Sequence, residues 1–292
     1  MTRPRTECAI ARSLNELETL RENLPRPLAI VPTMGALHEG HLSLITKART
    51  AGAKSVIVTI FVNPSQFAAG EDFATYPRTE AQDIELLAAA GVELVWLPTV
   101  ETIYPRDFAT VISLPKLSQD FEGQIRPNHF SGVATVVTRL LRLVRPELAV
   151  FGEKDYQQLT VIRHLVHDLA LGVEVISAPT VRSTTGLALS SRNRTLSTAG
   201  LDQAASLSAA LRKAAAALAE GAKLAPTLTQ ARAQILAAGF ETVDYFDLVL
   251  DGTLTSIKSE IVPLAARPAR LLTAARLEGV RLLDNWLVEG AP

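Results

Sequence analysis

Short apolar runs alternate with longer amphipathic segments along the first 180 residues or so. Five runs are apolar at successive positions, which is typical of strands buried on both faces: 28–33, 55–62, 93–98, 147–152 and 173–179. Four segments between them repeat apolar residues at helical spacing, and several end in Gly or basic residues, as helices do: 41–52, 80–91, 134–144 and 157–170. This alternation predicts an α/β fold, with a parallel sheet, right-handed crossovers and helices on both faces.

The pattern changes after about Val181. Residues 182–196 are polar and turn-like, and two helical segments follow, an Ala-rich one at 201–221 and another at 226–240. Three predicted strands come after them, at 244–250, 260–266 and 269–277. Helices grouped before strands favour a separate, smaller α+β domain. We therefore expect two domains, 1–183 and 184–292.

Composition narrows the class of protein. The 292 residues carry a formal net charge of −1, which argues against a broad basic surface for nucleic acid or an anionic membrane. The single cysteine, Cys8, excludes an intrachain disulfide and fits a reducing compartment. The N-terminus lacks the apolar core of a signal peptide, and no run of about 18 apolar residues occurs. We expect a soluble, cytoplasmic protein.

The segment PTMGALHEGH, Pro32–His41, follows a predicted strand and opens a predicted helix. Ligands bind at this position in open α/β sheets, and free N–H groups at a helix start can hold phosphate. Gly35 and Gly40 permit close backbone approach. The segment is no P-loop, because His41 and Leu42 stand where that motif needs Lys and Ser or Thr.

Two imidazoles lie three residues apart in this segment, at His38 and His41. They can stabilise negative charge on a transferring phosphoryl group, or donate and accept a proton. The alternative is that both only cap or pack the helix start. We favour the functional interpretation, since two of the five histidines fall together at the expected ligand position. Zinc ligation is the weaker option.

The segment FVNPSQF, Phe61–Phe67, ends the second strand, where Pro64 fixes a turn. Asn63 and Gln66 then lie at the carboxyl edge of the sheet. A Gln side chain can orient a hydroxy acid without an ionic clamp. The alternative is an ordinary surface turn. Further along the chain, Asp83 is a candidate carboxylate beside a metal ion, and the protein ligands of a metal are otherwise unknown.

Two further segments carry charge. In FGEKDYQQL, Gly152 frees the backbone after a strand, Lys154 can neutralise a phosphate, and Asp155 can cap the next helix or accept from a ribose hydroxyl. The alternative is a charged helix cap with a solvated lysine. In LALSSRN, hydroxyl groups precede Arg192, whose planar fork suits phosphate. The second segment has the character of a mobile lid, and its alternative is a polar linker.

Together these four segments resemble the pantothenate synthetase family, within the superfamily that carries the HxGH signature. The resemblance runs from about Ile30 to Asn285. It implies a Rossmann-like nucleotide- and pantoate-binding domain at 1–183 and an α+β lid domain at 184–292. It also implies condensation of pantoate with β-alanine through a pantoyl adenylate, with ATP consumed and AMP and pyrophosphate released. Mg²⁺ and a homodimer belong to the same expectation.

The resemblance also assigns roles to residues. It implies that His38, His41, Lys154 and Arg192 are catalytic. Pantoate and β-alanine would contact Asn63, Gln66 and Gln158. Contacts with ATP are implied for Met34, Gly35, Ala36, Leu37, His38, Glu39, Gly40, His41, Gly152, Glu153, Lys154, Asp155, Val181, Leu189, Ser190, Ser191 and Arg192.

The chain departs from the family pattern at Asn128, Ser131 and Thr185. Asn128 replaces a usual Gly, and Asn tolerates a left-handed backbone, so we expect the turn to survive. His129, next to it, is expected to be structural or interfacial. Two other functions stay open: a nucleotidylyltransferase that leaves the nucleotide on its acceptor, and a nucleotide-sensing module without catalysis. Pyrophosphate release that requires pantoate would discriminate among the three.

Overall fold

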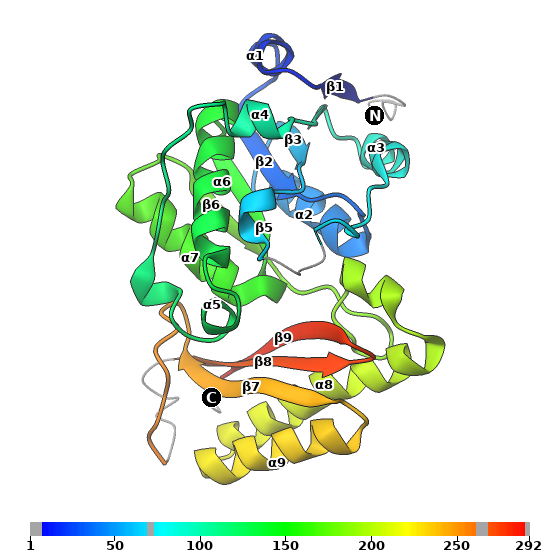
Figure 1. Ribbon diagram of the computed structural model, residues 1–292, viewed down its shortest axis with the longest axis vertical. Helices are drawn as coiled ribbons and strands as arrows, with labels where there is room; N and C mark the ends of the chain where they lie inside the picture. Colours follow the sequence, from blue (N-terminus) through cyan, green and yellow to red (C-terminus); the bar gives the residue numbers. More distant parts are fainter. Residues whose placement is uncertain (1–7, 69–72, 261–267, 290–292) are drawn as a thin grey trace. The chain divides into compact units, whose positions relative to one another are not determined.

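A computed structural model describes residues 8–68, 73–260 and 268–289 (Figure 1). The chain divides into two compact units. The first comprises Met1–Glu153 and Gln157–Pro179, and the second comprises Lys154–Tyr156 and Thr180–Pro292. The second unit thus includes three residues from the middle of the chain, and its main part begins four residues before the predicted boundary at 183/184.

The first unit contains a six-stranded parallel sheet in the order β1-β4-β3-β2-β5-β6. Its strands are β1 (Ala9–Ala11), β2 (Leu28–Thr33), β3 (Ser55–Ile60), β4 (Leu94–Trp96), β5 (Leu148–Gly152) and β6 (Glu174–Ala178). The chain adds β3 on one side of β2 and later β5 on the other, so the strand order reverses at β2. Such a switch point creates the crevice in which open α/β sheets bind ligands.

Helices cover both faces of this sheet (Figure 1). They are α1 (Leu14–Glu22), α2 (Glu39–Thr50), α3 (Glu80–Ala89), α4 (Val100–Ile103), α5 (Glu122–Ile125), α6 (His129–Val144) and α7 (Tyr156–Asp168), with single 3-10 turns η1 (Pro64–Gln66), η2 (Pro115–Leu117) and η3 (Glu153–Asp155). Helices α2 and α3 pack on one face, and α1 and α6 lie on the other. The predicted fold class is confirmed.

Side-chain alternation along β2 explains the two-sided core. Ala29 and Val31 point into the cluster that α2 and α3 complete. Leu28 and Ile30 are buried as completely as Ala29 and Val31. Because successive strand residues point to opposite faces, Leu28 and Ile30 face the helices on the other side of the sheet. The continuous apolar run that predicted this strand therefore reflects helices on both sides.

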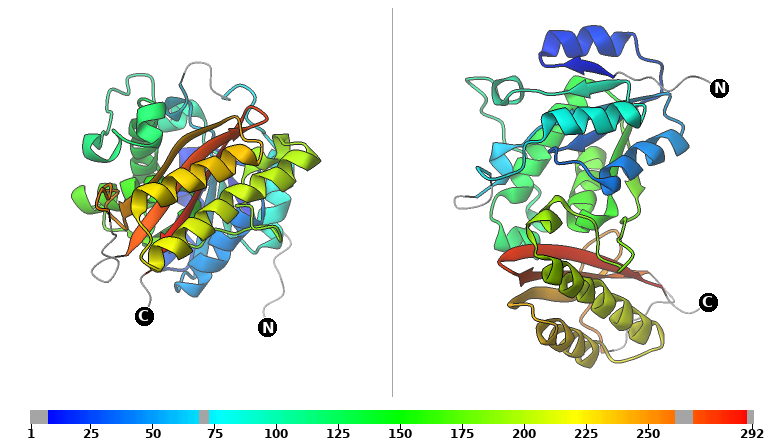
Figure 2. Two further views of the ribbon diagram at one scale, coloured as in Figure 1. Left: turned by 90° about the horizontal axis from the view of Figure 1, so that it is seen from below. Right: turned by 90° about the vertical axis from the view of Figure 1, so that its right-hand side faces the viewer.

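The second unit is an antiparallel sheet in the order β7-β8-β9, with two helices packed together against it (Figure 2). Its elements are η4 (Ser191–Thr195), α8 (Thr198–Ala219), α9 (Leu224–Ala237), β7 (Thr242–Leu250), β8 (Ala269–Leu277) and β9 (Val280–Val288). Leu207, Leu211 and Ile235 of the helices meet Phe246 and Leu271 of the sheet in one apolar core. The α+β prediction is confirmed, while nearly all of the strand predicted at 260–266 lies outside the described residues.

Candidate active site

The predicted segments of the first unit leave the sheet at three neighbouring strands, β3, β2 and β5. Residues 34–41 follow β2, residues 61–67 follow β3, and Gly152 ends β5. Because the strands are parallel, their carboxyl ends lie at one edge, beside the switch point. The fold therefore gathers at one edge three segments that are far apart in the sequence.

His38 and His41 cap helix α2 together. His38 is the N-cap residue, and its Nδ1 accepts a hydrogen bond from Gly40 N at 3.1 Å. His41 Nδ1 accepts from His38 N at 3.3 Å, so the pair forms a reciprocal capping box. The two rings lie 4.2 Å apart, centroid to centroid. Capping, the alternative in the sequence interpretation, is thus present in the structure.

The capping bonds also fix which nitrogen of each ring carries the proton. A backbone N–H can only donate, so Nδ1 of His38 and of His41 must be unprotonated. In a neutral imidazole the proton then resides on Nε2. Each ring thus uses Nδ1 for the helix cap and, in the neutral form, carries its proton on Nε2.

Asp83 fixes the loop that leads into α2. Its carboxylate, 1% exposed, accepts hydrogen bonds from Ala36 N at 3.0 Å and Leu37 N at 2.8 Å. Thr79 Oγ1 donates to the same carboxylate at 3.1 Å. Gly35 has a φ of +84°, and a Cβ there would lie 3.0 Å from Asp83 Oδ2. Asp83 therefore anchors the loop, and its oxygens are engaged by the protein itself.

These bonds correct one expectation from the sequence. The amides of Ala36, Leu37, His38 and Gly40 all have partners within the protein. They are not the unpaired donors that the start of a helix ordinarily offers to phosphate. In this segment the cap engages the backbone amides and the Nδ1 atoms of both imidazoles.

Asn63 organises the turn that carries Gln66. Its side chain is 1% exposed, and Oδ1 accepts from Ser65 N at 3.3 Å and from Tyr104 Oη at 2.7 Å. Burial raises the pKa of Tyr104, so its hydroxyl remains a donor. Asn63 Nδ2 donates to Gln66 Oε1 at 3.0 Å. Asn63 is thereby fully engaged in positioning the turn.

The Gln66 amide reaches toward the segment that follows β2. Its Nε2 lies 3.2 Å from Met34 Sδ, a weak acceptor. The structure thus brings Gln66 together with Met34, two predicted site residues that are 32 positions apart in the sequence.

The start of α6 supports the same turn from behind. His129 Nδ1 lies 2.9 Å from the Gln66 carbonyl oxygen, which can only accept, so Nδ1 carries the proton. Arg126 Nη2 also donates to this carbonyl, at 3.4 Å. Asn128 adopts the left-handed conformation, with φ 68°, that the sequence predicted. The expected structural role of His129 is present.

Gly132, which the sequence interpretation missed, lets α6 approach this turn. A Cβ at Gly132 would lie 2.3 Å from Ser65 O and 2.7 Å from Gln66 N. The Gly132 carbonyl also accepts from Asn63 Nδ2 at 3.2 Å. A glycine flanked by polar and apolar helix formers, in the string HFSGV, was the available signal for a close backbone contact.

Two adjacent glutamines on α7 differ in how the protein uses them. Gln157 is buried, accepts from Glu122 N at 3.0 Å and donates to the carbonyls of Leu117 and Asp120. Gln158 is half-buried, and its amide makes no hydrogen bond to any residue that the structure describes. Gln158, the predicted ligand, is therefore the one with unused hydrogen-bonding capacity toward those residues.

In the second unit, residues 181–189 form a hairpin. Leu189 N donates to Val181 O at 2.9 Å, and Arg182 and Ala188 form an antiparallel bridge. Gly186 turns the chain with a φ of +92°, and Ser183 Oγ lies 2.8 Å from Thr185 Oγ1. The structure thus pairs Val181 with Leu189, and both were predicted to contact ATP.

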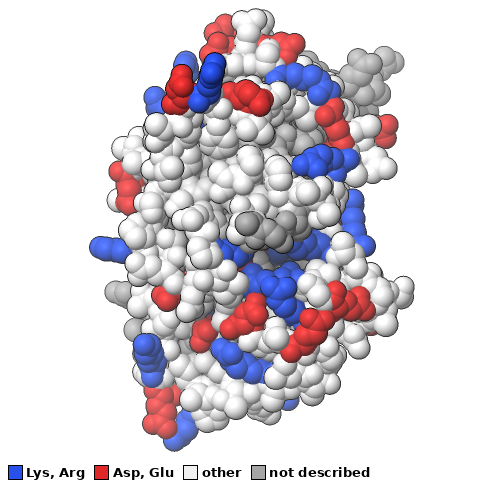
Figure 3. All heavy atoms as spheres, viewed as in Figure 1, with Lys and Arg blue, Asp and Glu red and all other residues white. Residues whose placement is uncertain are grey.

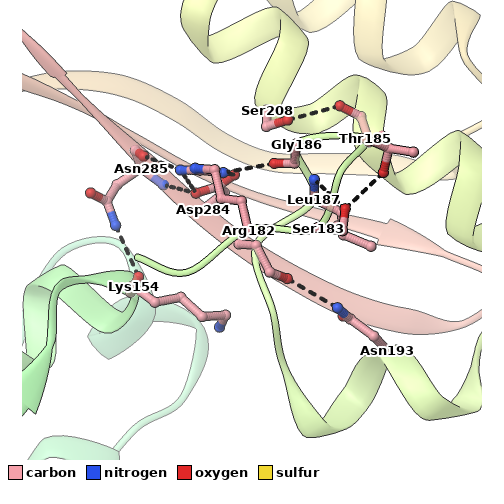
Figure 4. A network of polar contacts seen from close by, with 12 residues as sticks. Lys154, Arg182, Ser183, Thr185, Gly186, Leu187, Asn193, Ser208, Asp284 and Asn285 are labelled. Carbon is pink, nitrogen blue, oxygen red and sulfur yellow. Dashed lines mark hydrogen bonds and ion pairs between the residues drawn. The ribbon is translucent and has the colours of Figure 1, made fainter. Parts of the chain in front are cut away.

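An ion pair fastens this hairpin to β9 (Figure 4). Arg182 Nη1 and Nη2 lie 2.7 and 2.9 Å from the two oxygens of Asp284, which is almost fully buried. The Arg182 guanidinium also stacks on Trp286, 4.8 Å from the ring centroid. Such a bidentate ion pair is geometrically specific, so it fixes the position of the hairpin against β9.

A pocket in the second unit collects the predicted cationic residues. Lys154, Ser190 and Arg192 line it, together with Asn193 and Arg281. Ser190 Oγ accepts from Arg192 N at 3.3 Å and caps the turn η4, while Asn193 donates to Ala188 O. Lys154 Nζ lies 3.4 Å from Asp155 Oδ1. Three cationic side chains, Lys154, Arg192 and Arg281, thus line a pocket that also includes the Asp284 carboxylate, and cations of this kind can neutralise phosphate.

The predicted residues therefore fall in two groups. The first unit holds residues 34–41, Asn63, Gln66, Gly152, Glu153 and Gln158; the second holds Lys154, Asp155, Val181, Leu189, Ser190, Ser191 and Arg192. Each group is gathered by its own fold. Besides the carboxylates of Glu39 and Glu153, the first group offers amides and imidazoles, and besides that of Asp155, the second offers lysine and arginine.

No three His, Cys, Asp or Glu side chains within residues 8–68, 73–260 and 268–289 gather as they would around a metal ion. Asp83, the candidate carboxylate from the sequence, instead bonds to backbone amides. The described residues thus do not fit a metal site built from protein ligands.

The face in Figure 3 carries both acidic and basic side chains, and the chain has a formal net charge of −1. None of the described helices is both long enough and apolar enough to cross a membrane. Burial raises the pKa of the Cys8 thiol, as for a passive cysteine.

Comparison with known proteins shows to which family the chain belongs. The family model for pantoate-beta-alanine ligase matches residues 8–287. Pantothenate synthetase from Novosphingobium aromaticivorans is 50% identical over 284 residues, which cover 94% of this chain and 98% of the relative. The enzyme of the same name from Cereibacter sphaeroides is 52% identical over 258 residues, covering 88% of this chain and 90% of the relative.

Solved structures give the same result. Pantothenate synthetase from Thermus thermophilus superposes with a TM-score of 0.89 at 42% identity, covering 96% of this chain and 99% of that one. Pantoate-beta-alanine ligase from Francisella tularensis, complexed with beta-gamma ATP and beta-alanine, superposes with a TM-score of 0.80 at 34% identity, covering 98% and 99%. A family model that spans nearly the whole chain, and relatives about half identical to it, show that the chain belongs to the pantoate–β-alanine ligase family.

Proposed function

We propose that the residues gathered above carry out the family's ligase reaction in two steps. In the first, a pantoate carboxylate oxygen bonds to the α-phosphorus of ATP, the bond from that phosphorus to the bridging oxygen breaks, and pyrophosphate leaves. In the second, the β-alanine amine bonds to the acyl carbon, the acyl C–O bond breaks, and AMP leaves as the amine loses a proton. Adenylation is needed because a free carboxylate has no good leaving group.

His38 and His41 are the groups proposed for the adenylation step. Each ring is neutral when Nδ1 accepts its capping bond, so Nε2–H can donate to phosphate oxygens. Donors fixed before the reaction stabilise charge as it develops, without reorganisation. One such donor contributes about 10²–10³ in rate. This pair of capped imidazoles is the single observation that carries the proposal.

Lys154 and Arg192 are proposed to offset the charge of the departing pyrophosphate. Both line the same pocket of the second unit, with Ser190 beside them. Lysine acts as a compact point charge, whereas arginine can hold two phosphate oxygens at once. Val181 and Leu189, paired in the hairpin, are proposed to contact the nucleotide. The second unit would then act as the lid that the sequence suggested.

Gln66 and Gln158 are proposed to bind pantoate. An amide can donate to the carboxylate and accept from the hydroxyls of this substrate without forming an ion pair. Correct alignment of the carboxylate with phosphorus supplies much of the advantage of an enzyme over solution. Asn63 supports this binding by holding Gln66 at 3.0 Å, and we propose that its contribution comes through that bond.

Three further properties belong to the same proposal. Mg²⁺ is proposed to arrive on the triphosphate oxygens, since the described residues do not form a protein cage for it. A homodimer is proposed from the family resemblance, and a cytoplasmic location from the single cysteine, which fits a reducing compartment. Sedimentation of the purified protein and fractionation of cells would test these two.

The experiment that tests the function is pyrophosphate release with ATP and Mg²⁺. Pantoate alone, β-alanine alone and the two together are compared. The proposal predicts sustained release only with both, accompanied by stoichiometric AMP and pantothenate. Release that needs a different acceptor would favour a nucleotidylyltransferase, and none from folded protein would favour a binding module. Either result would overturn the proposal.

A further inference from the structure

Three residues of the segment FGEKDYQQL belong to the second unit, although the chain on both sides of them belongs to the first. These residues are Lys154–Tyr156, between Glu153 and Gln157. A short segment of this kind needs specific bonds to hold it, because its own length buries little apolar surface. The bonds lie at its two ends.

Asn285, on β9, holds the Lys154 end. Asn285 Nδ2 donates to the Lys154 carbonyl oxygen at 2.9 Å (Figure 4). The bond fixes the backbone from which the lysine side chain extends into the pocket. Asn285 itself is 4% exposed, so this donor is held in a fixed direction.

Asp251 holds the Tyr156 end. Tyr156 Oη donates to Asp251 Oδ1 at 2.5 Å and accepts from Gly252 N at 2.7 Å. Burial first, and the hydrogen bond to Asp251 second, raise the pKa of Tyr156, so the hydroxyl stays protonated and continues to donate.

Arg270, on β8, connects the two ends. Its Nη1 donates to Asn285 Oδ1 at 2.7 Å, and its Nε donates to Asp251 Oδ1 at 2.8 Å. The guanidinium also lies over the Tyr156 ring, 4.0 Å from the centroid. At 7% exposure this cation is nearly removed from water, where its hydrogen bonds to Asp251 and Asn285 are strong and directional.

We propose that Arg270, Asn285, Asp251 and Tyr156 are positioning residues for Lys154, and so for the charge that meets the phosphates of ATP. The inference rests on the proposed role of Lys154. In this proposal the C-terminal sheet contributes to catalysis, although none of its residues touches the substrate. The sheet sets the place of the lysine ammonium through the lysine backbone.

Position matters here because a displacement of about 1 Å in a reacting group can lower a rate roughly a hundredfold. Tyr156→Phe keeps the ring beneath Arg270 and removes only the hydroxyl. Asn285→Ala removes the bond to the Lys154 carbonyl. Each change loosens one end of the segment and leaves the Lys154 side chain chemically intact.

The test is a double-mutant cycle on the rate of pyrophosphate release in a single turnover with saturating pantoate. Tyr156→Phe and Asn285→Ala are each made alone and in combination with Lys154→Ala. Thr273→Val is the matched control, because Thr273 is a buried residue of the same sheet that bonds a backbone carbonyl away from the segment. Thermal unfolding of every variant checks that it is folded.

We expect each positioning variant to lower the rate about tenfold in the native background and less than about twofold when Lys154 is already Ala. Thr273→Val should leave the rate unchanged despite a comparable loss of thermal stability. Equal effects in both backgrounds would overturn the positioning role while leaving Lys154 catalytic. A native rate for Lys154→Ala alone would remove the proposed role of Lys154, and the inference with it.

Discussion

The start of α2 and the pocket of the second unit offer different kinds of side chain to a phosphate-bearing substrate. At α2, His38 and His41 are neutral groups locked by bonds to the backbone, and Asp83 holds the loop before them. In the pocket, Lys154 and Arg192 bring full positive charge on long side chains. The first region supplies fixed geometry, and the second supplies charge.

This difference predicts different consequences of mutation. Fixed donors act on charge that develops in the transition state, so their loss should lower the rate of adenylation itself. Groups that set the position of a substrate should change KM as well. Variants in the first unit can separate the two effects.

The largest effect is expected at His41. His41→Ala should lower pantoate-dependent pyrophosphate release about 10²–10⁴-fold, because it removes the Nε2–H donor. His41→Asn offers an oxygen in place of Nδ1 for the cap and should regain stability without regaining rate. His167→Ala, at an exposed position of the same unit, is the control and should be neutral. Recovery of rate in His41→Asn would mean that the imidazole serves only the cap.

Gly132→Ala should have the next largest effect. The added Cβ would meet the backbone of Ser65 at 2.3 Å, so α6 or the turn that carries Gln66 must move. We expect kcat/KM for pantoate to fall about a hundredfold, as for a 1 Å displacement, and stability to drop by about 1–3 kcal/mol. Steady-state kinetics and urea unfolding measure the two. Ser131→Ala, one residue earlier on α6, should change neither.

Asp83→Asn tests the anchoring of the loop before α2. An Asn can keep one acceptor toward Ala36 or Leu37, but its NH₂ group would face the other amide N–H. A buried donor without an acceptor costs about 1–3 kcal/mol, so the unfolding midpoint in urea should fall. We expect adenylation to slow about tenfold as the histidines lose their alignment. An unchanged rate in the destabilised variant would separate Asp83 from the reaction.

The smallest effects distinguish Gln158 from Gln157. Gln158→Ala should raise KM for pantoate about two- to tenfold, the worth of one neutral hydrogen bond, with little change in stability. Gln157→Ala should lower stability by about 1–3 kcal/mol, since the buried Glu122 N and the partly buried bonds to the carbonyls of Leu117 and Asp120 lose their partner. Its KM should stay near the native value. The reverse result would exchange the roles of the two residues.

Much of the fold was predictable because the apolar residues that form the core recur at the local spacing of a strand or a helix. The strands at 28–33 and 269–277 match their predicted ranges, since both lie in runs that are buried almost throughout. Strand β1 was not predicted, because three residues are too few to show a repeating pattern. Helix α1 was not predicted either, although Ser13 and Glu16 have the spacing of a capping box. Helix α6 begins five residues earlier than predicted, after the left-handed Asn128.

The site was predictable to the level of segments and not to the level of atoms. Local strings identified the residues at each strand end, but the bonds that use them come from distant parts of the chain. Asp83 holds Ala36 from 47 positions away, and Asn285 holds Lys154 from 131 positions away. Pairings at such separations are set by the tertiary fold, so composition and spacing could not assign them.

The central claim is that a pantoate carboxylate oxygen bonds to the α-phosphorus of ATP and stays on that phosphorus when AMP leaves. Pantoate labelled with ¹⁸O in its carboxylate, turned over with ATP and β-alanine, tests it directly. The account predicts AMP that carries one ¹⁸O per molecule, with unlabelled pyrophosphate, because the transferred oxygen stays on phosphorus when the acyl C–O bond breaks. Unlabelled AMP, or label in phosphate or pyrophosphate, would contradict it.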